Sequence, residues 1–185
     1  MRKIFIAGLG LLSMAIVNSV NAFQDRYVAY EKFALINDKH ERARHWAICA
    51  AIYEASAVVH ETLFNQPADA KQMRELSNGA KVAVSMTFVA EMAAEMGDLE
   101  ASGLVDRFKA TWDFAKLMSN TMPETIKTVI DADLSKVTDE NSLMDALKPI
   151  FETATICMSN VELQQAMINL WRELAMSGLL TVPNE

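Results

Sequence analysis

Glycine and proline are scarce in this chain of 185 residues, which contains six glycines and four prolines. Glycine-rich loops that cradle phosphate groups are absent from the sequence, as is the G-x-S-x-G turn that carries a nucleophilic serine. No segment alternates strictly between apolar and polar residues, so no strand is predicted. The chain is rich in alanine, leucine, methionine and glutamate, which favour helices. We predict an all-α protein and expect no enzymatic activity from it.

Positive charge is also in short supply. The sequence has 17 basic and 24 acidic side chains, a net charge of −7, and its lysines and arginines form no local cluster. A nucleic-acid backbone or an anionic lipid surface would repel such a protein. We therefore expect no nucleic acid among its partners. The acidity would steer the protein toward a basic partner.

The one long apolar run lies at the N-terminus. Arg2 and Lys3 precede an apolar segment from Ile4 to Val17, and Val20-Asn21-Ala22 places small residues around a cleavage point. This layout is typical of a secretory signal peptide, and the run is shorter than the ~20 residues of a membrane-spanning helix. We predict cleavage after Ala22, a periplasmic or secreted location, and no stable membrane insertion afterwards. Without Arg2 and Lys3, the mature chain has 15 basic and 24 acidic residues, a net charge near −9.

Residues 23–185 are predicted to form one helical domain after the signal peptide of residues 1–22. Apolar residues recur three and four positions apart along most of this stretch, as they do in amphipathic helices. The spacing predicts a single compact bundle of about six or seven helices. The predicted helices cover about 24–35, 38–64, 68–96, 100–119, 123–134, 139–157 and 160–178.

Several helix boundaries can be predicted from single residues. Asp38 and Asp139 have the sequence context of helix N-caps. Pro123 is predicted to open a new helix after an interruption at 120–122. Two further breaks are left open, one at residues 77–79 (Ser-Asn-Gly) and one at Pro149, where a helix would kink or divide.

Cys49 and Cys157 are the only two cysteines of the chain, and both lie on the apolar stripe of a predicted helix. Neither C-x-x-C nor C-x-x-C-H occurs, so the common redox and covalent-haem motifs are absent. In an oxidising compartment two core-facing thiols that meet are expected to pair. We predict a structural disulfide between them; two separate buried thiols and a redox pair are the alternatives.

The three histidines do not have the spacing of a metal site. His40 and His45 are five residues apart, whereas two ligands on one helix face need a separation of four. His60 has no second histidine near it, and the Glu-x-x-His pairs of di-iron bundles are absent. We predict three exposed histidines on helix surfaces; a zinc or iron site is the alternative.

Ten methionines remain after the predicted cleavage, and two pairs are spaced four apart: Met92 with Met96, and Met118 with Met122. Thioethers that face the same way suit cuprous copper. Methionine at helical spacing is also a common core residue. Core packing is the favoured interpretation, and a helical bundle that binds copper or a small apolar ligand is the alternative. No cofactor is predicted.

The sequence thus describes a helical scaffold without catalytic or metal motifs. Small, acidic, cysteine-paired helical proteins of this overall character resemble periplasmic immunity proteins and helical periplasmic chaperones, although no motif carries that resemblance. We predict a non-enzymatic periplasmic protein-binding module that recognises a resident or incoming, basic protein through a helix face or an interhelical groove. Trp46, Trp112 and Trp171 are predicted to anchor the core; any one exposed would mark a binding site.

Overall fold

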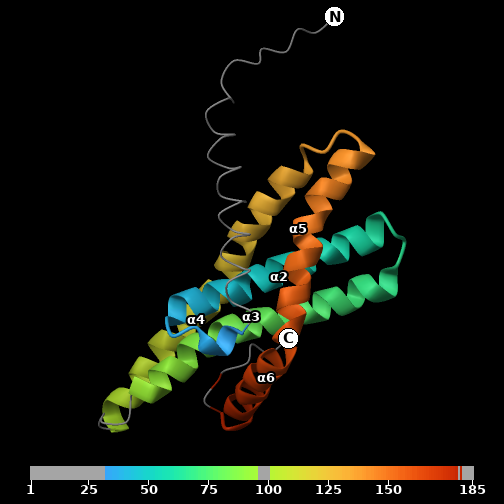
Figure 1. Cartoon of the computed structure of the whole chain (residues 1–185). Coiled ribbons are helices and arrows are strands. Elements are labelled where there is room, and N and C mark those ends of the chain that lie inside the picture. Colours follow the sequence, from blue (N-terminus) through green and yellow to red (C-terminus); the bar gives the residue numbers. More distant parts are fainter. Residues whose placement is uncertain (1–31, 96–100, 179, 181–185) are drawn as a thin grey trace, which may run out of the picture.

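The computed structural model describes residues 32–95, 101–178 and 180, and these residues are predominantly helical. Within these ranges the chain forms one short 3₁₀ helix and five α-helices, and no strand occurs (Figure 1). The predicted all-α class is confirmed. The predicted count of six or seven helices is not, and the signal peptide and most of the helix predicted over 24–35 lie outside the described residues. The elements are η1 (Phe33–Leu35), α2 (Lys39–Thr62), α3 (Pro67–Glu95), α4 (Ala101–Leu134), α5 (Glu140–Ser159) and α6 (Val161–Met176).

The helices are arranged on the two sides of a central hairpin. Helices α2 and α3 run antiparallel across the middle of the molecule, α4 crosses behind them, and α5 and α6 lie in front (Figure 1). Helix α5 packs mainly on α2, and α6 packs on α3. None of the described helices is long and apolar enough to cross a membrane.

Two predicted helix starts are confirmed by the capping contacts that the structure shows. The Glu41 backbone N–H donates to the Asp38 carboxylate over 2.8 Å at the start of α2. At the start of α5, the Ser142 N–H donates to Asp139 over 2.9 Å, and the Ser142 hydroxyl oxygen accepts from the Asp139 N–H. These contacts satisfy backbone donors that a helix start otherwise leaves unpaired.

Helix α4 continues through Pro123 from Ala101 to Leu134. The prediction that Pro123 opens a new helix is therefore wrong. Proline removes one backbone hydrogen bond, and the helix continues where packing holds the turns on both sides. Met118, Met122 and Ile126 supply that packing, because all three lie against the larger core. Helix α5 likewise continues through Pro149.

Helix α3 is also unbroken at residues 77–79. A Cβ atom added to Gly79 would lie 2.3 Å from Nε2 of Gln164 and 3.0 Å from Cδ1 of Ile168, both on α6. The glycine therefore permits a close approach of α6 to α3. Nearby, the Ser77 hydroxyl donates to the Ala50 carbonyl of α2 over 2.8 Å. The Ser-Asn-Gly sequence marks a helix crossing in this fold.

The larger core lies between α2 and α3 and extends to α4 and α6. Small residues such as Ala47 and Ala83 are fully buried there and let the two helices of the hairpin pack closely. Trp46 and Trp112 are buried in this core, and Trp171 of α6 packs against it. All three tryptophans anchor the core, as the sequence predicts.

His45 lies inside this core with only 3% of its surface exposed. The prediction of three exposed histidines is wrong at this position. Its Nδ1 is 2.7 Å from the Glu41 carbonyl oxygen, and its ring meets the edge of Phe33 at a centroid distance of 5.3 Å. Burial holds the pKa of His45 below its ordinary value, although Glu41 opposes that effect. The folded protein therefore keeps this imidazole neutral.

A neutral buried histidine makes stability depend on pH. The unfolded chain binds a proton at His45 near pH 6.5, whereas the folded chain resists it, so stability decreases as pH falls below about 6.5. The decrease approaches about 1.4 kcal/mol per pH unit until the folded pKa is reached. We expect the melting temperature to fall more steeply between pH 7.5 and 5.5 in the wild type than in His45→Asn, whose amide can replace the Nδ1 donor.

The exposed His40 provides the matched control, since His40→Asn makes the same change at a histidine outside the core. Parallel profiles for the wild type and His45→Asn would show that His45 does not carry this pH dependence.

Candidate binding surface on α4 and α5

Among the described residues, no group of three or more histidine, cysteine, aspartate or glutamate side chains could hold a metal ion. His40 lies against the ring of Phe88, and His60 pairs its Nδ1 with Oε1 of Gln66 at 2.9 Å. His45 is buried in the core. The structure therefore brings no two histidines together as ligands.

The predicted methionine pairs have different surroundings. Met118 and Met122 are half-buried and pack against the larger core. Met92 is buried, and Met96 lies outside the described residues. These contacts match the core-packing interpretation. Three other methionines are exposed, namely Met144, Met158 and Met176.

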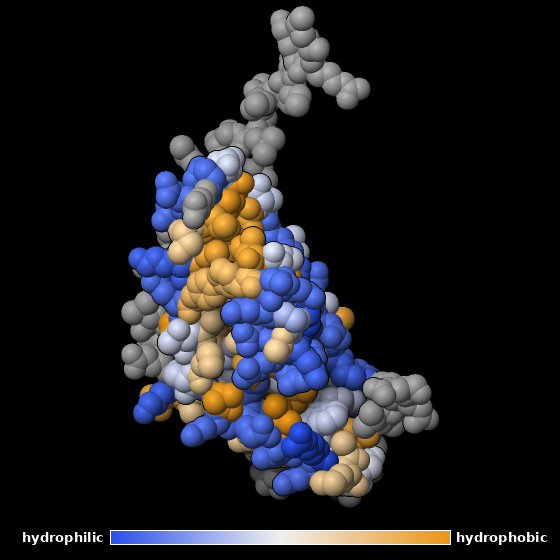
Figure 2. Space-filling view, turned by 90° about the vertical axis from the view of Figure 1, so that its right-hand side faces the viewer, coloured by the Kyte–Doolittle hydropathy of each residue, from blue (hydrophilic) through white to orange (hydrophobic). Residues whose placement is uncertain are grey.

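A second apolar cluster lies where α5 packs on α2 and includes the C-terminal half of α4. Its fully buried members come from α2 and α5, and the α4 members together with Leu143 of α5 remain half-buried. Figure 2 shows the face that lies on the right in Figure 1. An apolar strip occupies the upper part of this face, where α4 and α5 extend past α2 toward their connection. The half-buried members on α4 and α5 include Ile126, Ile130, Leu134 and Leu143.

Along α5 the apolar surface continues onto exposed side chains. Met144, Phe151 and Met158 are 62%, 36% and 49% exposed, and we call these three residues the α5 outer stripe. Residues seven positions apart lie close to one line along a helix, so the three side chains share one face. Leu147 and Ala154, which alternate with them, are buried in the second cluster. The stripe is thus the exposed margin of a packed apolar surface.

Carboxylates predominate around this surface. Between Glu124 and Glu152 the sequence has seven acidic residues and three lysines. Each lysine lies beside a carboxylate three or four residues away, at 2.5 Å for Lys127, 2.6 Å for Lys136 in the turn after α4, and 3.9 Å for Lys148. Hydrogen bonding to Asp131 raises the pKa of Lys127, so this lysine stays charged.

Two carboxylates of this region, Asp145 and Asp139, form no ion pair with a described lysine. Asp145 is exposed at the surface. The Ser142 backbone N–H, which donates to Asp139, holds the pKa of that carboxyl below its ordinary value. The rim therefore retains negative charge that is available to a partner.

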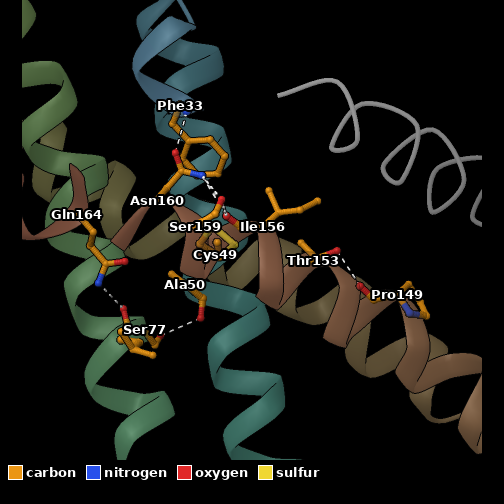
Figure 3. Close-up of a disulfide and its surroundings, with 12 residues drawn as sticks. Phe33, Cys49, Ala50, Ser77, Pro149, Thr153, Ile156, Ser159, Asn160 and Gln164 are labelled. Atoms are coloured by element: carbon orange, nitrogen blue, oxygen red, sulfur yellow. Dashed lines mark hydrogen bonds between the residues drawn. A yellow bond between two sulfur atoms is a disulfide. The ribbon is translucent and has the colours of Figure 1, made fainter. Parts of the chain in front are cut away.

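A disulfide fixes α5 in this position. Cys49 of α2 and Cys157 of α5 are bonded, with their Cα atoms 5.5 Å apart, and both are fully buried (Figure 3). The predicted pairing is confirmed. Because α5 touches α4 and α6 only slightly, this bond and the packing on α2 determine where α5 lies.

Polar contacts hold the junction of α5 and α6 beside the disulfide (Figure 3). The Phe33 N–H donates to Oδ1 of Asn160 over 2.9 Å in the buried interior, and the Asn160 amide donates to the Ile156 carbonyl over 3.0 Å. One turn later, the Gln164 amide donates to the Leu76 carbonyl of α3 over 3.2 Å. Asn160 and Gln164 therefore connect the junction to η1 and α3.

The surface has no group of metal-binding side chains among the described residues. It combines exposed apolar side chains on a helix, flexible thioethers and a rim of negative charge, all supported by a cross-linked scaffold. Sequence reasoning missed it because Met144, Phe151 and Met158 share one helix with buried residues. The heptad spacing was visible, but the sequence alone does not show which face α2 covers.

Comparison with known proteins adds no assignment, since no family model, no curated protein and no solved structure matches this chain.

The disulfide should contribute strongly to stability, because it closes a loop between residues 108 positions apart. The loop-entropy relation gives roughly 4–5 kcal/mol for a loop of this length. We expect the Cys49→Ser/Cys157→Ser double variant to unfold at a distinctly lower urea concentration than the wild type. Circular dichroism measures the unfolding transition of both proteins. Reduced wild-type protein should unfold like the double variant, and an unchanged midpoint in both would contradict a stabilising role.

Proposed function

We propose that this chain is an exported, non-enzymatic protein-binding module whose partner docks on the α4–α5 surface. The observation that carries the proposal is the exposed α5 outer stripe, which lies beside the second apolar cluster and among unneutralised carboxylates. Exposed apolar residues that adjoin one another on a rigid scaffold are typical of protein interaction sites.

The charge of the chain supports a basic partner. The net charge of −7 is reflected locally, since the segment from Glu124 to Glu152 has four more acidic than basic residues. Opposite charge on a partner would speed encounter and disfavour wrong partners. Cationic toxins and cell-wall hydrolases are partners of this chemistry, and binding of either would make the chain an immunity-type, inhibitor-type or chaperone-like protein.

Export is supported by the N-terminal sequence and is compatible with the disulfide. The basic start, the apolar run and the small residues before Phe23 are typical of a Sec-type signal peptide. A disulfide between two buried cysteines is compatible with an oxidising compartment such as the periplasm. We infer that the functional protein consists of residues 23–185 and acts outside the cytoplasm.

The proposal predicts where a partner can be cross-linked. With p-benzoylphenylalanine in place of Phe151, illumination of cells of the native host should yield a covalent adduct with one polypeptide of net positive charge. The same photoreactive residue in place of Phe114 is the control, because Phe114 is 43% exposed but lies on the N-terminal half of α4.

An adduct of equal yield from both positions, or no polypeptide adduct from position 151, would contradict the proposed surface.

The intact mass of the protein recovered in that experiment also tests export. It should correspond to a chain that begins at Phe23, and a mass that retains residues 1–22 would contradict cleavage after Ala22.

A further inference from the structure

The spacing of the α5 outer stripe restricts which kind of partner segment, helix or strand, can pack along it. Met144, Phe151 and Met158 repeat every seven residues, and the stripe covers 15 residues, with its ends about 21 Å apart along the helix axis. A seven-residue apolar repeat supplies one row of the seam along which a second helix packs at a small crossing angle, while Leu147 and Ala154, three residues further on, are buried in the second cluster. An extended strand repeats every two residues and would not follow this line.

The charges beside the stripe restrict the chemistry of that helix. Among the described residues beside the stripe, helix α5 has two exposed carboxylates, Asp145 and Glu152, and the single cation Lys148. Lys148 lies 3.9 Å from Glu152 of its own helix. A helix that lies along the stripe therefore meets a net negative flank and is favoured when its own flanks are basic.

A second copy of this chain fits the same stripe less well. Two copies that pack stripe against stripe would bring together two helices that each carry an excess of acidic residues, within mature chains of net charge near −9. Like charges that face each other across an interface oppose association. The charge therefore favours a basic partner over self-association.

We propose, on the basis of the proposed function, that the α5 outer stripe is the docking line for one basic amphipathic helix of the partner. The helix packs along α5 with apolar side chains at heptad positions against Met144, Phe151 and Met158. Its lysine or arginine flanks lie near Asp145 and Glu152. The thioethers of the two methionines adapt to apolar side chains of different shape.

Binding of synthetic helices to the full-length, disulfide-bonded protein tests this proposal. The probe is a fluorescein-labelled 18-residue peptide with leucine at heptad positions a and d and lysine on its flanks. Fluorescence anisotropy at low salt measures its binding. A second peptide replaces each lysine with glutamate, and a third has the composition of the first in scrambled order. We expect saturable binding of the first peptide and at least tenfold weaker binding of the other two.

Substitutions in the stripe then locate the bound helix. Met144→Glu/Met158→Glu should weaken binding of the basic heptad peptide at least tenfold. Both residues are substantially exposed, so the fold should be retained. Met176→Glu is the matched control: it makes the same change at a methionine that is 81% exposed at the end of α6, and it should bind the peptide like the wild type.

Four results would overturn the inference. One is equal binding of the scrambled or acidic peptide, and another is an equal effect of Met176→Glu. The third is a dimer in sedimentation experiments that Met144→Glu/Met158→Glu dissociates, because the stripe would then bind a second copy. If no peptide binds while position 151 still cross-links to a basic polypeptide, the helix inference is wrong and the proposed function stands.

Discussion

The bond between Cys49 and Cys157 is the constraint on which the arrangement of α5 depends. Helix α5 crosses α2 on the side of the hairpin opposite α4, and it has only slight contacts with α4 and α6. One fully buried disulfide near its C-terminal end attaches it to α2. Asn160 and Gln164 extend that attachment by binding η1 and α3. The last two helices are therefore held in place by a small number of strong contacts around one junction.

This attachment explains how an apolar helix face can stay exposed on a stable protein. Leu147 and Ala154 of α5 pack into the second cluster, whereas Met144, Phe151 and Met158 remain on the outer side. Burying those side chains within the chain would require α5 to rotate about its axis, and a cross-link at Cys157 opposes such a rotation. Rotation would also expose Leu147 and Ala154, so the stripe stays on the outer side of α5.

Much of the scaffold could be predicted from the sequence, because the relevant signals are local. Asp38 and Asp139 cap helices, and the two cysteines on apolar stripes pair in the fold. Other features depend on which residues pack against them in the tertiary structure. Pro123 stays within a helix because the core holds the turns on either side of it. Gly79 permits the close approach of α6 to α3.

The difference between local sequence signals and tertiary packing also applies to His45 and to the candidate site. His45 has charged neighbours in the sequence, yet the tertiary fold buries it beside Phe33. The stripe on α5 shows the opposite case, since its residues are as apolar as a core and lie outside it. Helical periodicity identifies apolar faces, but only the packing of α2 against α5 decides which of two adjoining faces is covered.

Hydrogen exchange measured by mass spectrometry on the oxidised and the reduced protein shows whether the disulfide holds α5 in place. We expect reduction of the disulfide to accelerate amide exchange throughout α5 and the start of α6, while the α2–α3 hairpin stays more protected. Exchange in α5 that is the same before and after reduction would contradict the claim that the disulfide holds this helix, and with it the outer stripe, in place.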